Sequence, residues 1–246
     1  MMSSAASATE KQSISLLPAT LERSEQLSPK ARLMTLRIEG DRPFNFLAGQ
    51  AVRVYQQFNG RLVPLFYSIA SAPRGDNRLE LCVKPGRTGS PSDHLCAAPV
   101  GSPLRISHPQ GGFVLQQSGA NTLFMAAGTG IAPIRSMIHW LVGRHALGRI
   151  RLIFGAKDAE SLFFHAEFAD LAARHTNFQY VPVLSRPHAA WKGASGHVQH
   201  HVEGVSREED TRAYLCGPPA MVESVRQSLG KRGWPEELIH YDRHGD

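Results

Sequence analysis

A glycine-rich turn in the second half of the chain has the chemistry of a phosphate site. It is Gly128-Thr129-Gly130, between the apolar run LFMAA and a helix expected to open at Pro133. Glycine lets the backbone turn sharply and lets a ligand come close, and the free N–H groups of a helix start attract phosphate. The turn departs from GxGxxG, because Pro133 stands at the third glycine and no acid is evident on a second strand. From this turn alone, a dinucleotide site and a plain strand–helix turn both remain open.

A second turn of the same kind follows another apolar run. AYL leads into Cys216-Gly217, and Pro218-Pro219 then opens a helical pattern. Ligands of open α/β sheets lie beyond the carboxyl ends of the strands, where both turns are expected. Two such turns in one sheet are much less expected by chance than one. Cys216 by itself is more typical of a small buried hydrophobe than of a reactive thiol.

The elements that must hold these turns alternate between strand and helix. The pattern predicts strands at 121–127, 149–157, 178–185, 211–217 and 239–243, and helices at 133–147, 164–175 and 219–233. Such alternation is typical of a parallel sheet with right-handed crossovers. The apolar stripe of the 133–147 helix, formed by Ile134, Ile138, Leu141 and Val142, is expected to be core.

The first half of the chain has a different pattern, with short apolar runs separated by Pro, Gly, Asn and Asp. Strands are predicted within 17–28, 31–40, 42–58, 62–71, 79–84 and 102–115, with one helical piece at 90–98 capped by Ser90 or Ser92. These features favour an antiparallel barrel or sandwich. We therefore expect a flexible tail at 1–13, an antiparallel β-barrel at 14–116 and an α/β parallel-sheet domain at 117–246.

Composition narrows the class of protein. The 246 residues are 42% hydrophobic and 20% charged, which excludes a disordered chain, a collagen-like repeat and a long coiled coil. Lys+Arg 27 against Asp+Glu 21 gives a net charge of +6. This balance favours a phosphate-bearing ligand or an acidic partner, although solvated basic residues without a partner explain it equally well. The basic residues are dispersed and not interleaved with aromatics, so nucleic-acid binding is not expected.

No segment indicates a membrane span or a secretory signal. Apolar runs stay well short of the roughly 20 residues that cross a bilayer, and MMSSAASATEKQ lacks the basic-then-apolar order of a signal peptide. The three cysteines form no CxxC pair, which argues against a zinc, disulfide or iron–sulfur framework. A reducing cytoplasm is the expectation. His197, His200 and His201 lack a completing ligand, so no metal site is predicted.

Seven segments, in order along nearly the whole chain, resemble the ferredoxin–NADP reductase superfamily, in particular the flavin and NAD(P)H modules of oxygenase reductases. PLFYSIAS (64–71) resembles the flavin motif Arg-x-Tyr-Ser, and GSPSDHL (89–95) the flavin phosphate turn. The other segments are GTGIAP (128–133), FGAKDAESLFF (154–164), LSRP with WKGASGHV (184–198), CGPPAM (216–221) and HYDRHGD (240–246).

The resemblance implies a flavin-binding barrel, a nucleotide-binding α/β domain and a flavin ring in the cleft between them. The implied cofactors are FAD, with FMN as an alternative, and NADPH or NADH. Tyr67 would pack on the ring, Ser68 would bond near flavin N5, Ser92 would meet flavin phosphate, and Cys216 would lie beside the nicotinamide. The resemblance implies cofactor-binding roles for Phe66, Tyr67, Ser68, Val83, Lys84, Gly89, Ser90, Ser92, Gly128, Thr129, Gly130, Pro133, Ser185, Arg186, Cys216, Gly217 and Pro218, and catalytic roles for Ser68, Cys216 and Tyr241.

Two departures from the family pattern bear on the flavin. Leu65 occupies the position of the Arg that pairs with flavin phosphate, so the hypothesis is that Arg53, Lys84 or Arg87 supplies the charge. Tyr241 and His244 are candidates for the C-terminal aromatic cover of the ring. A tail that merely ends the last strand is the alternative reading of that segment.

The activity that the resemblance implies is hydride transfer from the nicotinamide to the flavin. Electrons would then leave to a separate acceptor, either an acidic protein such as ferredoxin or flavodoxin, or an oxygenase component. A non-catalytic flavin-fold subunit and a self-sufficient enzyme reducing a small molecule are the alternatives. Arg186 at the adenosine end would favour a 2′-phosphate, but NADH users have similar residues. The acceptor, the donor, the flavin type and the oligomeric state stay open.

Overall fold

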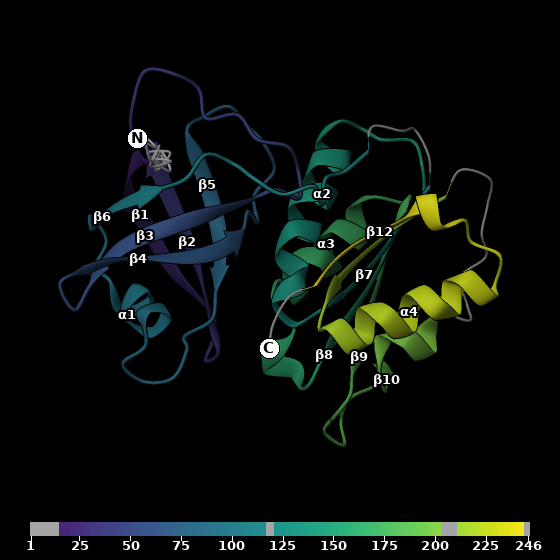
Figure 1. The fold of residues 1–246 in the computed structure, drawn as a ribbon. Coiled ribbons are helices and arrows are strands. Elements are labelled where there is room, and N and C mark those ends of the chain that lie inside the picture. Colours follow the sequence, from purple (N-terminus) through teal and green to yellow (C-terminus); the bar gives the residue numbers. More distant parts are fainter. Residues whose placement is uncertain (1–14, 117–120, 203–210, 244–246) are drawn as a thin grey trace, which may run out of the picture.

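The computed structural model describes residues 15–116, 121–202 and 211–243. Two six-stranded sheets follow one another along the chain and lie side by side (Figure 1). The tail predicted at 1–13 and the candidate His244 lie outside the described residues. In the part of the chain that is described, no helix is both long and apolar enough to span a bilayer.

The first sheet is antiparallel throughout and curls into a barrel, as expected. Its order is β4-β3-β6-β1-β2-β5, and a bridge between Ile69 and Leu81 brings its two edges together. The strands are β1 (Leu17–Ser28), β2 (Ala31–Ile38), β3 (Ala51–Phe58), β4 (Arg61–Ser68), β5 (Arg78–Val83) and β6 (Pro103–Ile106). Phe44 and Phe46 pack in the core without belonging to a strand, so the strand predicted within 42–58 is shorter than its apolar run.

One short helix, α1 (Pro91–Ala97), lies against the barrel. Its N-cap is Ser90, whose hydroxyl accepts the Asp93 N–H at 3.2 Å. Of the two serines that the sequence offered for this cap, the structure selects the first. Leu95 is the residue that α1 buries in the barrel core.

The second sheet is parallel throughout, with the order β10-β9-β8-β7-β11-β12. Its strands are β7 (Thr122–Ala127), β8 (Ile150–Ala156), β9 (Phe178–Leu184), β10 (Ala194–Ser195), β11 (Arg212–Gly217) and β12 (Ile239–Arg243). Helices α2 (Ile131–Gly143) and α3 (His165–Arg174) bury their apolar residues on one face, and α4 (Pro219–Lys231) covers the other. Helix α2 begins at Ile131, two residues before the proline expected to open it.

Helix α2 joins the two sheets. Its buried Met137 and Ile138 share a hydrophobic cluster with Ala48 and Phe113 of the barrel half. The Ser136 hydroxyl donates to the carbonyl of Ser71 at 2.6 Å. These buried contacts hold α2 against the barrel half.

Candidate functional site

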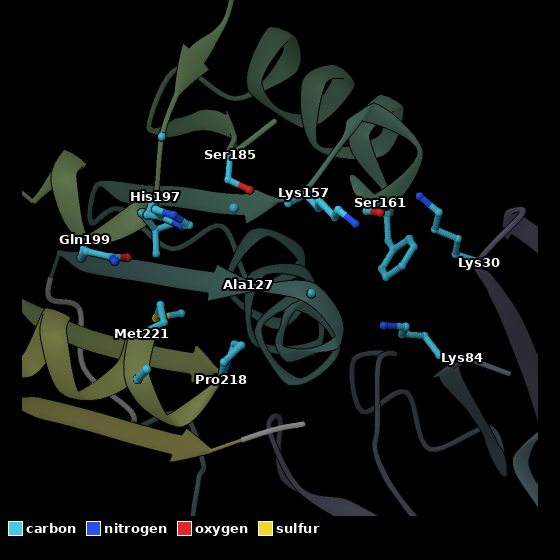
Figure 2. Close-up of a pocket in the computed structure, with 17 residues that line it drawn as sticks. Lys30, Lys84, Ala127, Lys157, Ser161, Ser185, His197, Gln199, Pro218 and Met221 are labelled. Carbon is cyan, nitrogen blue, oxygen red and sulfur yellow. The ribbon is translucent and has the colours of Figure 1, made fainter. Parts of the chain in front are cut away.

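A cleft of about 570 Å³ opens at the carboxyl ends of the parallel strands (Figure 2). One side is lined by residues at the ends of β7 and β8 and by residues that follow β9 and β11, and the other side by Lys30 and Lys84 of the barrel half. The lining residues are Lys30, Lys84, Ala127, Gly128, Gly155, Ala156, Lys157, Ser161, Phe163, Ser185, Gly196, His197, Val198, Gln199, Pro218, Ala220 and Met221.

The two glycine turns predicted from sequence meet at this edge of the sheet. A Cβ atom on Gly130 would lie 2.3 Å from the carbonyl oxygen of Cys216 and 2.8 Å from the nitrogen of Gly217. Gly128 adopts φ +58°, a left-handed conformation that favours glycine. Only a residue without a side chain therefore allows the first turn to pack on the backbone of the second.

Three lysines lie toward one end of the cleft (Figure 2). Lys84 directly follows β5, Lys157 directly follows β8, and Lys30 comes from the turn between β1 and β2. Lys30 and Lys84 reach in from the barrel side, opposite Lys157. Ammonium groups and glycine backbone facing one cavity suit the phosphates of a dinucleotide, so the residues present fit that cofactor.

The other residues predicted for nucleotide binding divide into two groups. Ser185 and Pro218 line the cleft. Arg186 is exposed beside it, and its backbone N–H donates to the carbonyl of Lys157, a lining residue, at 2.8 Å. Thr129 is half-buried in the first turn, whereas Gly217 and Pro133 are buried and do not line the cavity. Pro133 instead packs inside α2.

Cys216 lies in the core rather than at the cleft surface. Its side chain is fully buried in the cluster that contains α2. Burial raises the pKa of the Cys216 thiol well above its ordinary value, and nearby Asp242 adds to the effect. The group is therefore a neutral thiol that shapes the wall behind the two turns.

On the barrel side, the register of β3 with β4 decides which side chains share a face. Tyr67 pairs with Val52 and Leu65 pairs with Val54, and both valines are fully buried. Leu65 and Tyr67 therefore face the barrel core, against which both pack. Phe66 pairs with Arg53 on the opposite face, where the Phe66 side chain is 54% exposed.

Tyr67 also reaches the turn predicted to hold flavin phosphate. Its hydroxyl lies 3.3 Å from the Ser92 hydroxyl oxygen, and burial raises the pKa of the phenol. The Ile69–Leu81 bridge brings the end of β4, which carries Tyr67, alongside β5, which leads to Lys84 in the cleft. An aromatic face beside that lysine fits a flavin ring.

The remaining predicted flavin residues have mixed surroundings. Ser68 and Val83 are buried, with Val83 in the barrel core. The Gly89 N–H donates to the Asp93 carboxylate at 2.9 Å, and Ser90 caps the seven-residue α1. The Asp93 carboxylate thus accepts a backbone N–H of the turn that the resemblance assigns to flavin phosphate.

Tyr241 lies away from the cleft. The Arg226 guanidinium of α4 stacks on its ring at 4.4 Å, on the face of the sheet that α4 covers. Its neighbour His240 instead stacks on Tyr214 at 4.8 Å, on the face of α2. Strand alternation therefore turns Tyr241 away from the barrel, and this position does not support a role as flavin cover.

Sequence reasoning missed Lys30 and Lys157 at the cleft, and His197 and Gln199 near the adenosine-side segment. Both lysines stand in turns where a charged residue is ordinary, so no local pattern distinguishes them. No group of three or more His, Cys, Asp and Glu is placed to hold a metal ion among the residues described.

Known proteins match both halves of the chain. The family model described as "Oxidoreductase FAD-binding domain" matches residues 18–115, and "Oxidoreductase NAD-binding domain" matches residues 124–227. Ferredoxin--NADP reductase B of Sorangium cellulosum is 33% identical over 235 residues, covering 92% of this chain and 96% of that protein.

Two further proteins are also similar to this chain. The phenol hydroxylase P5 protein of Acinetobacter pittii is 32% identical over 231 residues, which cover 92% of this chain and 64% of that protein. The crystal structure of the Amycolatopsis cytochrome P450 reductase GcoB superposes with a TM-score of 0.83 at 28% identity, over 93% of this chain and 69% of that one. The chain thus belongs to the ferredoxin–NADP reductase superfamily, as an NAD(P)H-dependent flavin oxidoreductase with FAD and NAD(P)H as cofactors.

Proposed function

We propose that this oxidoreductase takes electrons from NADPH or NADH and passes them through FAD to a separate acceptor protein. The observation that carries the proposal is the single cleft to which both glycine turns and the barrel residue Lys84 contribute. In this proposal residues 14–116 bind the flavin and residues 117–246 bind the nucleotide. When bound, the nicotinamide supplies a hydride and the flavin accepts it and releases electrons singly or in a pair.

The chain's own contribution is binding and orientation. The Gly128 turn and Lys157 would hold the phosphates of the nicotinamide dinucleotide, while Ser185 and Arg186 would contact its adenosine end. The buried contacts of α2 fix the distance between the two halves. Holding two reacting groups in line is worth several kcal/mol, which is the catalytic role left to the protein.

The acceptor is proposed to be an acidic electron carrier such as ferredoxin or flavodoxin, or an oxygenase component. The 246 residues hold three cysteines, fewer than the four that ligate a [2Fe–2S] cluster. A net charge of +6 attracts an acidic partner. Two relatives are named as a ferredoxin--NADP reductase and a phenol hydroxylase component.

Anaerobic mixing with NADPH and, separately, with NADH is expected to bleach the flavin absorbance of the FAD-loaded protein. Reduced protein should then reduce an added ferredoxin or flavodoxin, at a rate that falls as salt rises because charge steers the encounter. Stopped-flow absorbance measures both steps. A colourless protein that refuses FAD and FMN would favour the non-catalytic subunit, and reduction of small acceptors alone would favour the self-sufficient enzyme.

The substitution Lys84→Ala is expected to weaken FAD binding roughly tenfold, because a charge-assisted hydrogen bond to phosphate is lost. Arg53→Ala removes one charge from the opposite face of the barrel wall and should bind FAD as the wild type does. Arg87→Ala tests the third candidate. Arg87 lies in the turn before α1, where its backbone carbonyl accepts the Ser90 N–H. Fluorescence titration gives the affinities, and unchanged binding in both Lys84→Ala and Arg87→Ala would refute this source of charge.

A further inference from the structure

Lys30 belongs to the barrel half but makes its contacts across the cleft. Its Nζ atom lies 2.7 Å from Asp158 Oδ2 and 3.5 Å from Glu160 Oε2, both on the loop that follows β8. The side chain is 43% exposed and also lines the cleft (Figure 2). The Asp158 hydrogen bond raises the pKa of Lys30 despite partial desolvation, so the group is an ammonium at neutral pH.

The two carboxylates that contact Lys30, those of Asp158 and Glu160, have different surroundings. Asp158 Oδ1 accepts the Ser161 N–H at 3.0 Å and the Ser161 hydroxyl at 2.6 Å, which caps the 3-10 turn Ala159–Ser161. Glu160 is 62% exposed, and its contact with Lys30 is the longer of the two. Asp158 therefore shapes the loop, whereas Glu160 is the partner that Lys30 can exchange at least cost.

The ammonium sits on the border of the cavity. Lys30 lines the cleft, but Asp158 and Glu160 are not among its lining residues. Asp158 accepts one N–H of the ammonium at 2.7 Å, whereas Glu160 makes only an ion-pair contact at 3.5 Å, which a phosphate oxygen can replace. A phosphate oxygen in the cleft can thus be bound by Lys30 without breaking the Asp158 contact.

The order of the strands indicates which phosphate this would be. Lys30 lies over the end of β8, and β8 lies between β7, which leads to Gly128, and β9, which leads to Ser185. A dinucleotide with its adenosine end at Ser185 and its phosphates toward the Gly128 turn would have its pyrophosphate near the end of β8.

We infer that Lys30 binds the pyrophosphate of the nicotinamide dinucleotide from the barrel side, exchanging Glu160 for a phosphate oxygen while Asp158 holds it in position. This inference rests on the proposed function, because it takes the cleft to be the dinucleotide site. It adds a cofactor contact from the flavin half of the chain. The bound nucleotide would then contact both halves of the chain, the barrel half through Lys30.

The test is titration of NADP+ and of NAD+ into the FAD-loaded protein and its variants at low salt. Lys30→Gln is expected to weaken both nucleotides roughly tenfold, and Lys30→Arg to retain most of the affinity. Glu160→Gln is expected to tighten both about two- to threefold, because a competing negative charge is removed. Lys231→Gln removes the same charge at the far end of α4 and should leave both affinities unchanged.

Glu160→Gln separates this role from a purely structural one. If Lys30 only braced the two halves, loss of its Glu160 partner would weaken nucleotide binding instead of tightening it. Unchanged affinity in Lys30→Gln, or weakening confined to NADP+, would overturn the assignment to the pyrophosphate. A wild-type protein that binds neither nucleotide and is reduced by neither donor would instead overturn the proposed function.

Discussion

Replacing Arg135 with methionine is expected to lower the free energy of unfolding by about 3–5 kcal/mol, because it removes the buried arginine that two partly buried carboxylates, Glu80 and Glu167, share. Arg135 is on α2, and its side chain is only 9% exposed. Its Nη1 atom donates to Glu80 Oε2 at 2.7 Å and to the Ala70 carbonyl at 2.9 Å, both in the barrel half. The substitution therefore weakens the junction between the two domains.

The other side of the guanidinium is equally occupied. Its Nε and Nη2 atoms donate to the two oxygens of Glu167 at 2.7 and 3.0 Å. The guanidinium also stacks on the ring of Phe164 at 4.6 Å. Because this geometry uses the planar fork of arginine, Arg135→Lys is expected to recover little of the lost stability.

Differential scanning calorimetry measures the loss as a fall of roughly 10 °C in the unfolding midpoint. Arg174→Met is the matched control, because its pair with Asp170 on α3 is 61% and 60% exposed. An exposed pair of this kind is worth well under about 1 kcal/mol. Equal midpoints for Arg135→Met and Arg174→Met would contradict the predicted interdomain role.

The defect is also expected to depend on pH. Burial alone would raise the pKa of Glu167, but hydrogen bonds from His139 and Arg135 outweigh it and hold this pKa below its ordinary value of 4.5. A lowered pKa gives a stabilising contribution that is present above pH 4.5 and is lost as pH falls through the folded-state pKa. In Arg135→Met the part of this lowering that Arg135 supplies is lost, so Glu167 protonates at a higher pH than in the wild type and the stability gap should narrow on acidification.

The substitution Gly130→Ala is expected to cost about 1–3 kcal/mol and to weaken NAD(P)+ binding at least roughly tenfold. The new Cβ would lie 2.3 Å from the carbonyl oxygen and 2.5 Å from the carbonyl carbon of Cys216. These are backbone atoms of β11, which pairs with β7 on one side and β12 on the other and cannot swing aside as a flexible side chain can. The Gly128 turn must move instead, away from the position at which it faces the cleft.

Nucleotide titration and thermal unfolding measure the two effects together. Gly230→Ala is the control, since a Cβ atom on this exposed glycine near the end of α4 would meet nothing within 4 Å. There alanine should stabilise the helix by about 0.5–1 kcal/mol. A Gly130→Ala protein with wild-type affinity and midpoint would show that the two turns need no close backbone contact.

The architecture could be predicted from the sequence because it is encoded locally. Alternating short runs before position 116 and strand–helix alternation after it come from the periodicity of each element, which does not depend on distant residues. The two glycine turns could be found for the same reason. The stripe on α2 was predicted correctly for Ile134 and Ile138, which are fully buried, whereas Leu141 and Val142 are only partly buried.

Tertiary packing decided the residues that join the domains. Nothing near Arg135 in the sequence distinguishes it from an arginine on a solvent face, and only the docking of the barrel on α2 buries it. Lys30 precedes Asp158 by 128 positions, so no local pattern relates them. Strand alternation fixes the two faces of β12 but not which of them the barrel approaches, so the contact of Tyr241 with Arg226 could not be predicted. Local periodicity thus fixed the elements and their turns, whereas the partners of each charged side chain depended on long-range packing.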